Sequence, residues 1–254
     1  METLIPRLLI GCGIGLAMIS LFSCGPSDSG NGGDDDERQA KRRAWMVKTQ
    51  LAARDITNDR VLDAMRAVPR HLFVPQPILE HAYEDRALAI GSGQTISQPY
   101  IVALMTQLAD PKPTDRALDI GTGSGYQAAV LSGLVKSVHS IEIVPELATS
   151  ARERLKTLGY ANVEVREGDG YRGWPEHAPF DVIILAAAPK EVPPALTEQL
   201  APGGRLVLPV GAGRGEQRLL LITKKENGEL ETKTIAPVAF VPMTGEVEKG
   251  ERED

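Results

Sequence analysis

Residues 118–126 read Leu-Asp-Ile-Gly-Thr-Gly-Ser-Gly-Tyr, the end of an apolar strand followed by a glycine-rich loop. Gly121, Gly123 and Gly125 let the backbone turn sharply and approach a ligand closely. A loop of this kind after the first strand of a parallel α/β sheet marks the crevice where nucleotides bind. Glu142 lies 21 residues after Gly121, at the end of the next predicted strand, where its carboxylate can accept hydrogen bonds from ribose hydroxyls. The loop and this acid together predict a nucleotide-type ligand.

Outward from this loop, predicted strands and helices alternate along the chain. Apolar runs predict strands at 116–120, 137–143, 163–165, 180–185 and 205–210, and helices at 126–134, 145–158 and 193–200. Two final runs, 218–224 and 232–240, flank a turn sequence at 226–229 and predict an antiparallel hairpin. The alternation predicts a doubly wound, mostly parallel α/β sheet that ends in an antiparallel C-terminal hairpin.

An N-terminal helical extension precedes the sheet. Apolar residues spaced by three and four predict helices over 40–68, with Thr57 or Asn58 as the cap of the second. A short helix is predicted near 76–83 and a turn at 91–94. Ser97-Gln98-Pro99 predicts the start of a further helix, because serine suits the cap and proline the first turn.

The first forty residues are predicted to contain a signal peptide and a flexible linker. Residues 8–22 form an apolar run of fifteen, preceded by Arg7 and followed by Ser23 and Cys24. The run is short for a membrane span and resembles a bacterial lipoprotein signal, with Cys24 as the lipidated residue. An uncleaved membrane anchor and a misassigned start codon are the alternatives. We predict a signal peptide over 1–23, export to the periplasm and anchoring through Cys24.

The predicted organisation continues with a flexible acidic linker and one folded domain. Residues 24–40 are rich in Gly, Ser and Asp, which cannot repay their ordering entropy by burial. The single domain is predicted over 41–254, with N-terminal substrate or lid helices at 41–110 and the cofactor-binding sheet at 114–245.

Charge and residue content exclude several classes of protein. The net charge is −6, of which residues 24–40 carry −4, so the body is nearly neutral and does not predict a nucleic-acid binder. Both cysteines, Cys12 and Cys24, precede the body, which excludes a cysteine nucleophile there. The four histidines show no ligand spacing, and we predict no metal. They are His71, His81, His139 and His177.

The loop resembles the first motif of S-adenosylmethionine-dependent methyltransferases. The dinucleotide fingerprint requires glycine where this chain has Tyr126, and the lysine of a phosphate-binding loop is absent. The G-x-G-x-G spacing with Asp119 two residues ahead matches the methyltransferase motif instead. Gly168-Asp169-Gly170 lies where such enzymes place an acid that accepts the adenine amino group. This resemblance implies a seven-stranded Rossmann-like sheet.

Further motifs resemble the protein-L-isoaspartate O-methyltransferase family over about residues 44–245. They are VPRHLFVP (68–75), AYED (82–85), GQTISQPY (93–100), GGRLV with PVG (203–211) and FVPMTG (240–245). The segment within 93–100 is not a general methyltransferase motif, which makes the resemblance specific. Two departures are Ser92, where many members carry histidine, and the export signal, since the family is usually cytoplasmic.

The resemblance implies methyl transfer from S-adenosylmethionine to the α-carboxylate of L-isoaspartyl residues in damaged proteins, which initiates repair through a succinimide. A carboxylate is already ionised at neutral pH, so the reaction needs no general base. Ser97 is the implied catalytic residue, orienting the substrate carboxylate. The implied cofactor-binding residues are Asp119, Gly121, Gly123, Gly125, Glu142, Asp169 and Gly170. We expect isoaspartyl proteins and peptides as partners, and a monomer.

Simpler roles for these residues remain alternatives. Ser97 can cap a helix, Asp119 and Asp169 can serve turns, and Glu142 can be a solvated strand-end carboxylate. The segment around Arg70 and its neighbouring histidine either orients peptide or forms a structural lid. Two other functions also remain open. One is a methyltransferase of the same fold acting on a small molecule, and the other is a lipid-tethered binding module with a vestigial site.

Overall fold

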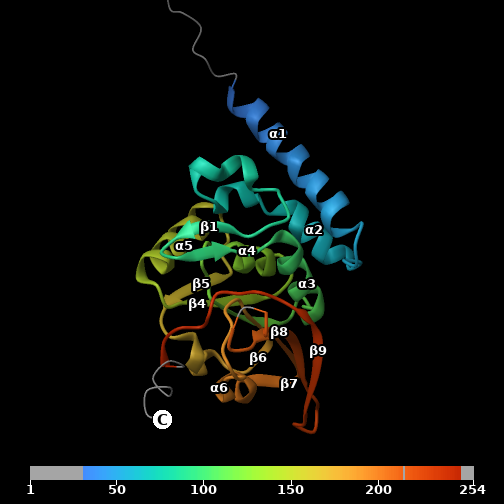
Figure 1. Ribbon diagram of the computed structural model, residues 1–254, viewed down its shortest axis with the longest axis vertical. Coiled ribbons are helices and arrows are strands. Elements are labelled where there is room, and N and C mark those ends of the chain that lie inside the picture. Colours follow the sequence, from blue (N-terminus) through green and yellow to red (C-terminus); the bar gives the residue numbers. More distant parts are fainter. Residues whose placement is uncertain (1–30, 214, 247–254) are drawn as a thin grey trace, which may run out of the picture.

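The computed structural model of the chain describes residues 31–213 and 215–246. Its centre is a seven-stranded sheet of strand order β5-β4-β3-β6-β7-β8-β9 (Figure 1). Strands β3 to β7 run parallel, and β8 pairs antiparallel with both β7 and β9, which confirms the predicted fold class. The strands are β3 (Arg116–Ile120), β4 (Ser137–Glu142), β5 (Val163–Glu167), β6 (Phe180–Leu185), β7 (Leu200–Val210), β8 (Arg218–Lys224) and β9 (Leu230–Pro237).

The two faces of the sheet carry separate hydrophobic cores, because side chains alternate along each strand. On β3, Ala117 belongs to one core, while Leu118 and Ile120 belong to the other. The first core lies under α3 (Pro99–Ala109), α4 (Tyr126–Ser132) and α5 (Pro145–Thr157), and the second under α6 (Pro194–Glu198) and the 3-10 turns η4 (Gly170–Arg172) and η5 (Pro175–His177). Helices on both sides of the sheet explain why residues 182–185 of the central strand β6 are all apolar and buried.

The N-terminal region adds helices and a small hairpin. Its elements are α1 (Asn31–Met46), the π-helical turn η1 (Val47–Leu51), α2 (Asp59–Ala67), η2 (Arg70–Phe73), η3 (Gln76–His81), β1 (Leu88–Gly91) and β2 (Gln94–Ile96). Asn58 caps α2, as predicted, its Oδ1 accepting from the backbone N–H of Arg60 at 3.0 Å. The β1–β2 hairpin was predicted only as a turn, because strands of four and three residues show no clear alternation.

The predicted linker over 24–40 is wrong in its second half, since residues 31–40 belong to helix α1. An ion pair one turn apart, Lys41 to Glu37 at 2.6 Å, supports the helix, and Gln39 is buried. Its other end is tied down by side chains, as Arg42 donates to the carbonyl of Glu80. Tertiary contacts thus stabilise a helix that its composition alone does not predict.

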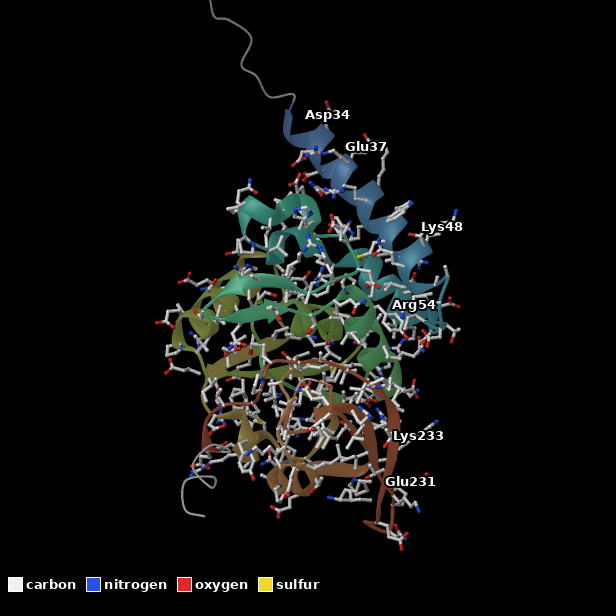
Figure 2. The ribbon with its side chains drawn as sticks, viewed as in Figure 1. Asp34, Glu37, Lys48, Arg54, Glu231 and Lys233 are labelled. Atoms are coloured by element: carbon white, nitrogen blue, oxygen red, sulfur yellow. The ribbon has the colours of Figure 1, made fainter. Side chains whose placement is uncertain are left out.

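Helix α1 extends past the rest of the domain, with Asp34 and Glu37 on its outer part (Figures 1 and 2). At the opposite side of the molecule β9 forms the sheet edge, and its exposed Glu231 and Lys233 protect that edge from pairing with another chain (Figure 2). Among the described helices, none is long and apolar enough to cross a bilayer. The predicted signal peptide and Cys24 lie outside the described residues.

Candidate active site

A pocket opens at the carboxyl ends of β3, β4 and β6, the edge at which parallel α/β sheets bind ligands. Of the described residues that line it, Glu142 alone is charged, and none is a histidine or a cysteine. The lining residues are Gln94, Thr95, Ile96, Ser97, Val102, Met105, Ile120, Gly121, Thr122, Gly123, Ser124, Tyr126, Gln127, Ile141, Glu142, Ile143, Gly170, Leu185, Ala186, Ala187, Val241, Pro242, Met243 and Thr244. A mostly uncharged pocket with one carboxylate suits a ligand that carries a compensating positive charge.

The glycine loop forms one wall of this pocket. Gly121 and Gly123 line it and have φ angles of 85° and 53°, in the left-handed region that glycine favours. Gly125, with φ of 89°, does not line the pocket. It lets α4 begin close to α5, because a Cβ there would lie 3.1 Å from Leu155 Cδ1. Two of the three predicted glycines therefore line the pocket, and the third serves packing.

Glu142 is both a pocket residue and a brace for the loop. It is 5% exposed, and its Oε2 accepts the backbone N–H of Gly123 at 2.7 Å. Its Oε1 accepts the backbone N–H of Val144 at 3.0 Å. These two bonds hold the carboxylate at the end of β4, in the wall of the pocket, so it is not the solvated strand-end group of the alternative interpretation.

Asp119 lies beneath the loop and is not among the residues that line the pocket. It is fully buried, and its Oδ2 accepts the hydroxyl of Ser140 at 2.7 Å, while Thr122 shares a hydrogen bond with that hydroxyl at 2.6 Å. Burial raises the pKa of Asp119 to about 7, and the nearby charge of Glu142 adds to the effect. Asp119 therefore supports the loop through Ser140 and Thr122, and it does not line the pocket, where a direct contact with the cofactor was predicted.

Asp169 and Gly170 follow β5, and of the two only Gly170 is among the residues that line the pocket. Asp169 Oδ1 accepts the N–H of Tyr171 at 2.9 Å, which is the turn predicted as its alternative role, and its Oδ2 accepts the N–H of Glu246 at 2.7 Å. Gly170 lines the pocket itself. A Cβ on Gly170 would lie 2.2 Å from Ile120 Cγ2, so only glycine fits there.

Ser97 lies in the wall that this pocket shares with a second cavity. It follows β2 and lines both cavities, together with Thr95, Ala186 and Val241. The second cavity is further lined by Ala87, Gln98, Ile101, Gly215, Pro237, Val238, Ala239 and Phe240. The cap of α3 is Gln98 and makes no side-chain cap bond, so the interpretation of Ser97 as a helix cap is wrong.

Arg70 holds the Ser97 segment from behind, a role that the sequence did not indicate. The side chain is fully buried, and Nη2 donates to the Ser97 carbonyl while Nε donates to the Ala82 carbonyl, both at 2.8 Å. Its guanidinium carbon lies 4.7 Å from the centre of the Tyr126 ring. Burial lowers the pKa of Arg70 to about 10. His71 bonds to the Tyr83 hydroxyl at 2.7 Å, and neither it nor Arg70 lines the two cavities.

Asp85 is a second residue whose position only the fold reveals. Its Oδ1 accepts the N–H of Tyr100 at 2.9 Å, and its Oδ2 accepts the side-chain amide of Gln98 at 2.8 Å. A carboxylate thus stands at the N-terminus of α3, where the helix dipole favours negative charge. The only sequence signal was its place in the 82–85 motif.

The C-terminal segment closes the pocket. Its backbone pairs with Ala188, which follows β6. The Ala188 N–H donates to the Val241 carbonyl at 2.8 Å, and the Met243 N–H donates to the Ala188 carbonyl at 2.9 Å. This pairing places residues 241–244 against the end of β6.

Comparison with known proteins identifies the family. Residues 41–248 match the family described as Protein-L-isoaspartate(D-aspartate) O-methyltransferase (PCMT). Protein-L-isoaspartate O-methyltransferase 2 of Nitrosococcus oceani is 59% identical over 204 residues, which span 80% of this chain and 90% of that protein. The Opitutus terrae protein-L-isoaspartate O-methyltransferase is 55% identical over 211 residues, 83% of this chain and 90% of that protein.

Solved structures agree with the sequence relatives. One protein-L-isoaspartate O-methyltransferase superposes with a TM-score of 0.74 at 28% identity, covering 84% of this chain and 69% of that one. A protein of Plasmodium falciparum described as a putative protein-L-isoaspartate O-methyltransferase, in complex with S-adenosyl-L-homocysteine, has a TM-score of 0.69 at 27% identity and covers 80% of this chain and 98% of that one. The chain therefore belongs to the protein-L-isoaspartate(D-aspartate) O-methyltransferase family of protein-repair enzymes, as its motifs predicted.

Proposed function

We propose that S-adenosylmethionine binds in the glycine-loop pocket and that its methyl group is transferred, at Ser97, to an isoaspartyl α-carboxylate that enters from the second cavity. The observation that carries this proposal is the shared wall, because Thr95, Ser97, Ala186 and Val241 line both cavities. A methyl donor in one cavity and an acceptor in the other meet only at this wall.

The pocket offers the groups that the cofactor needs. Glu142 faces the ligand and can accept hydrogen bonds from the ribose hydroxyls. The Gly170 wall and the apolar side chains of Ile120 and Met243 suit a flat adenine ring. The P. falciparum relative, described in complex with S-adenosyl-L-homocysteine, supports this assignment, since that molecule is the demethylated form of the cofactor.

The main task of the protein in this reaction is to align the acceptor oxygen with the methyl group. A carboxylate oxygen attacks the methyl carbon while the carbon–sulfur bond breaks, and the sulfur leaves as a neutral thioether. The acceptor is ionised above about pH 4, so no residue has to remove a proton. Ser97 donates a hydrogen bond that orients the acceptor oxygen, and enclosure between the two cavities strips it of water.

The product then reacts without help from the enzyme. The following amide nitrogen attacks the ester carbonyl and expels methanol, which closes a succinimide ring. Hydrolysis of that ring yields aspartyl and isoaspartyl products, so repeated cycles restore normal aspartate.

The second cavity favours a peptide over a small-molecule acceptor. Its walls come from the β2–α3 connection on one side, with the polar side chains of Ser97 and Gln98, and from the apolar residues 237–241 on the other. No charged side chain lines it within the described residues. A peptide can lay flanking residues along such walls, which a small charged acceptor cannot use.

The direct test incubates the full chain with labelled S-adenosylmethionine and paired peptides containing isoaspartate or aspartate at one position. We expect labelling of the isoaspartyl peptide only. Labelling of both peptides would refute the substrate assignment, and labelling of neither would support the vestigial-site alternative.

Ser97→Ala tests the catalytic assignment. We expect kcat/KM for the isoaspartyl peptide to fall about 10- to 100-fold, because an oriented donor is lost, while cofactor affinity stays within about twofold. Ser132→Ala at the end of α4, which lines neither cavity, is the matched control and should leave both parameters unchanged. A large loss of cofactor affinity in Ser97→Ala would place the hydroxyl in the cofactor site instead.

Export and lipid anchoring through Cys24 remain a proposal, supported by the apolar run 8–22 and the Ser23–Cys24 junction. The alternative is a cytoplasmic enzyme, and an exported one requires a supply of S-adenosylmethionine outside the cytosol. Processing that is sensitive to globomycin and lost in Cys24→Ser would support the anchor. Recovery of the uncleaved chain in the cytosolic fraction would refute it.

A further inference from the structure

Two histidines and a glutamate meet at the end of the sheet opposite the active site. His139 lies on β4, Glu164 is its register partner on β5, and His177 ends the η5 turn. Glu142, at the pocket, is three residues further along β4, which corresponds to about 10 Å of strand. The prediction that the histidines are scattered is wrong for these two, which the β5–β6 connection brings together from 38 positions apart.

The side-chain atoms of the cluster converge on one point. Glu164 Oε2 lies 4.0 Å from His139 Nε2 and 3.8 Å from His177 Nε2, and one ligand atom from each residue lies within 4.8 Å of the others. Donors around one tetrahedral zinc ion are roughly 3.4 Å apart, given bonds of about 2.0 to 2.1 Å. The side chains of Glu164 and His177 are 59% and 34% exposed, so they can move the remaining distance by rotation.

Aromatic packing holds the rings on which the site depends. Trp174 packs edge-on against both imidazoles, at 5.5 Å from His139 and 4.9 Å from His177, and Phe180 lies 5.7 Å from His139. Arg116 donates to the carbonyl of His177 and so ties the η5 turn to β3. The His139 side chain is 9% exposed, and its buried Nδ1 has no hydrogen-bond partner. The packing of Trp174 and Phe180 therefore holds the imidazole of His139 in place.

We propose that His139, Glu164 and His177 bind one divalent transition-metal ion of the zinc type. Two imidazoles and a carboxylate are a known zinc ligand set that leaves one coordination position for water. Calcium and magnesium, which prefer oxygen ligands, do not fit two imidazoles. Each ligand comes from a different element, so the ion clamps the η5 turn to β4 and β5.

The clamp would act on the segment that carries Gly170. Residues 168–177 run from the pocket wall to His177, so fixing their far end restricts the wall that faces the cofactor. The ion lies away from the reacting atoms. We therefore expect it to raise stability, with no requirement for it in methyl transfer.

The test measures Zn²⁺ binding by isothermal titration to the full, untagged chain after treatment with a chelator. His177→Ala and Glu164→Gln remove exposed ligands and preserve the buried His139. We expect each to weaken the site at least about tenfold, and to abolish the rise in unfolding temperature that Zn²⁺ produces in the unsubstituted chain. His81→Ala is the matched control, because that histidine pairs separately with Glu84 at 2.7 Å.

Cobalt supplies a readout of geometry. Co²⁺ bound by nitrogen and oxygen ligands in a four-coordinate site has strong visible absorption, which we expect in the unsubstituted chain and in His81→Ala but not in His177→Ala. Equal zinc affinity in His177→Ala, Glu164→Gln and the unsubstituted chain would overturn the proposal. Cys12 and Cys24 are present in every variant, so zinc that they bind is measured equally in all of them. The proposal would also be overturned if the unsubstituted chain bound no more zinc than His177→Ala does.

Discussion

Gly170→Ala tests whether close packing at the pocket wall decides cofactor binding. An added Cβ would lie 2.2 Å from Ile120 Cγ2, 3.5 Å from Ile120 Cβ and 3.7 Å from Met243 Cε. Both neighbours line the pocket, and Ile120 is 3% exposed at the end of β3, so the backbone after β5 has to move by about 1 Å.

The expected cost follows from that displacement. Overpacking of a buried site costs about 1 to 3 kcal/mol, and the loss of glycine freedom in the unfolded chain returns less than about 1 kcal/mol. We therefore expect a net loss of about 1 to 2 kcal/mol in the free energy of unfolding. Because the moved segment is a pocket wall, cofactor affinity should fall about tenfold or more.

The matched control is two residues away. A Cβ on Gly168 would meet nothing closer than Arg166 Nε at 3.6 Å, so Gly168→Ala adds the same methyl group without a clash. Urea unfolding measures stability, and titration with S-adenosyl-L-homocysteine measures affinity. Ile120→Ala in the Gly170→Ala background should recover part of the loss, as a coupling of about 0.5 to 3 kcal/mol. Equal stability and affinity in the two glycine variants would refute the reasoning.

Two further predictions concern buried charged groups. Burial raises the pKa of Asp119 from 3.8 to about 7, so the folded state favours the protonated carboxyl. The contribution of Asp119 to the free energy of unfolding is therefore fully present below about pH 4 and is lost as the pH rises towards 7. Asp119→Asn should therefore gain stability relative to the unsubstituted chain between pH 4 and 7, by up to about 1.4 kcal/mol per pH unit; a pH-independent difference in urea unfolding would contradict this. Arg70→Lys keeps the charge but cannot bridge the carbonyls of Ala82 and Ser97 together, so we expect a loss of about 1.5 to 3 kcal/mol in stability and a lower kcat. Unchanged kcat in Arg70→Lys would show that the bridge does not position Ser97.

Much of the fold follows from local pattern. The mainly apolar segments 116–120 and 180–185 become β3 and β6 because strands covered by helices on both faces need mostly hydrophobic sequence. The glycine loop and Glu142 lie together because the carboxyl ends of adjacent parallel strands meet at one edge. These features depend on residues close in sequence or on a general rule of sheet construction.

Helix 31–46 shows where local pattern fails. Its first half is polar and glycine-containing, which by composition favours disorder, yet hydrogen bonds from Arg42 to the carbonyl of Glu80 and from Arg43 to the carbonyl of Arg66 hold the segment as helix. Composition measures what a segment can bury by itself. It does not measure the surface that the rest of the chain offers.

The roles of single residues divide in the same way. Gly121 and Gly123 could be assigned from sequence, because a bend next to a ligand needs glycine whatever surrounds it. The burial of Asp119 beneath the loop and the bond of Arg70 to Ser97, 27 positions away, could not. The contact between the rings of His139 and His177 likewise forms only when the η5 turn packs against β4. Long-range contacts depend on how helices and strands pack in three dimensions. The periodicity of apolar residues in a sequence predicts which face of an element a side chain lies on, but not which residue it contacts there.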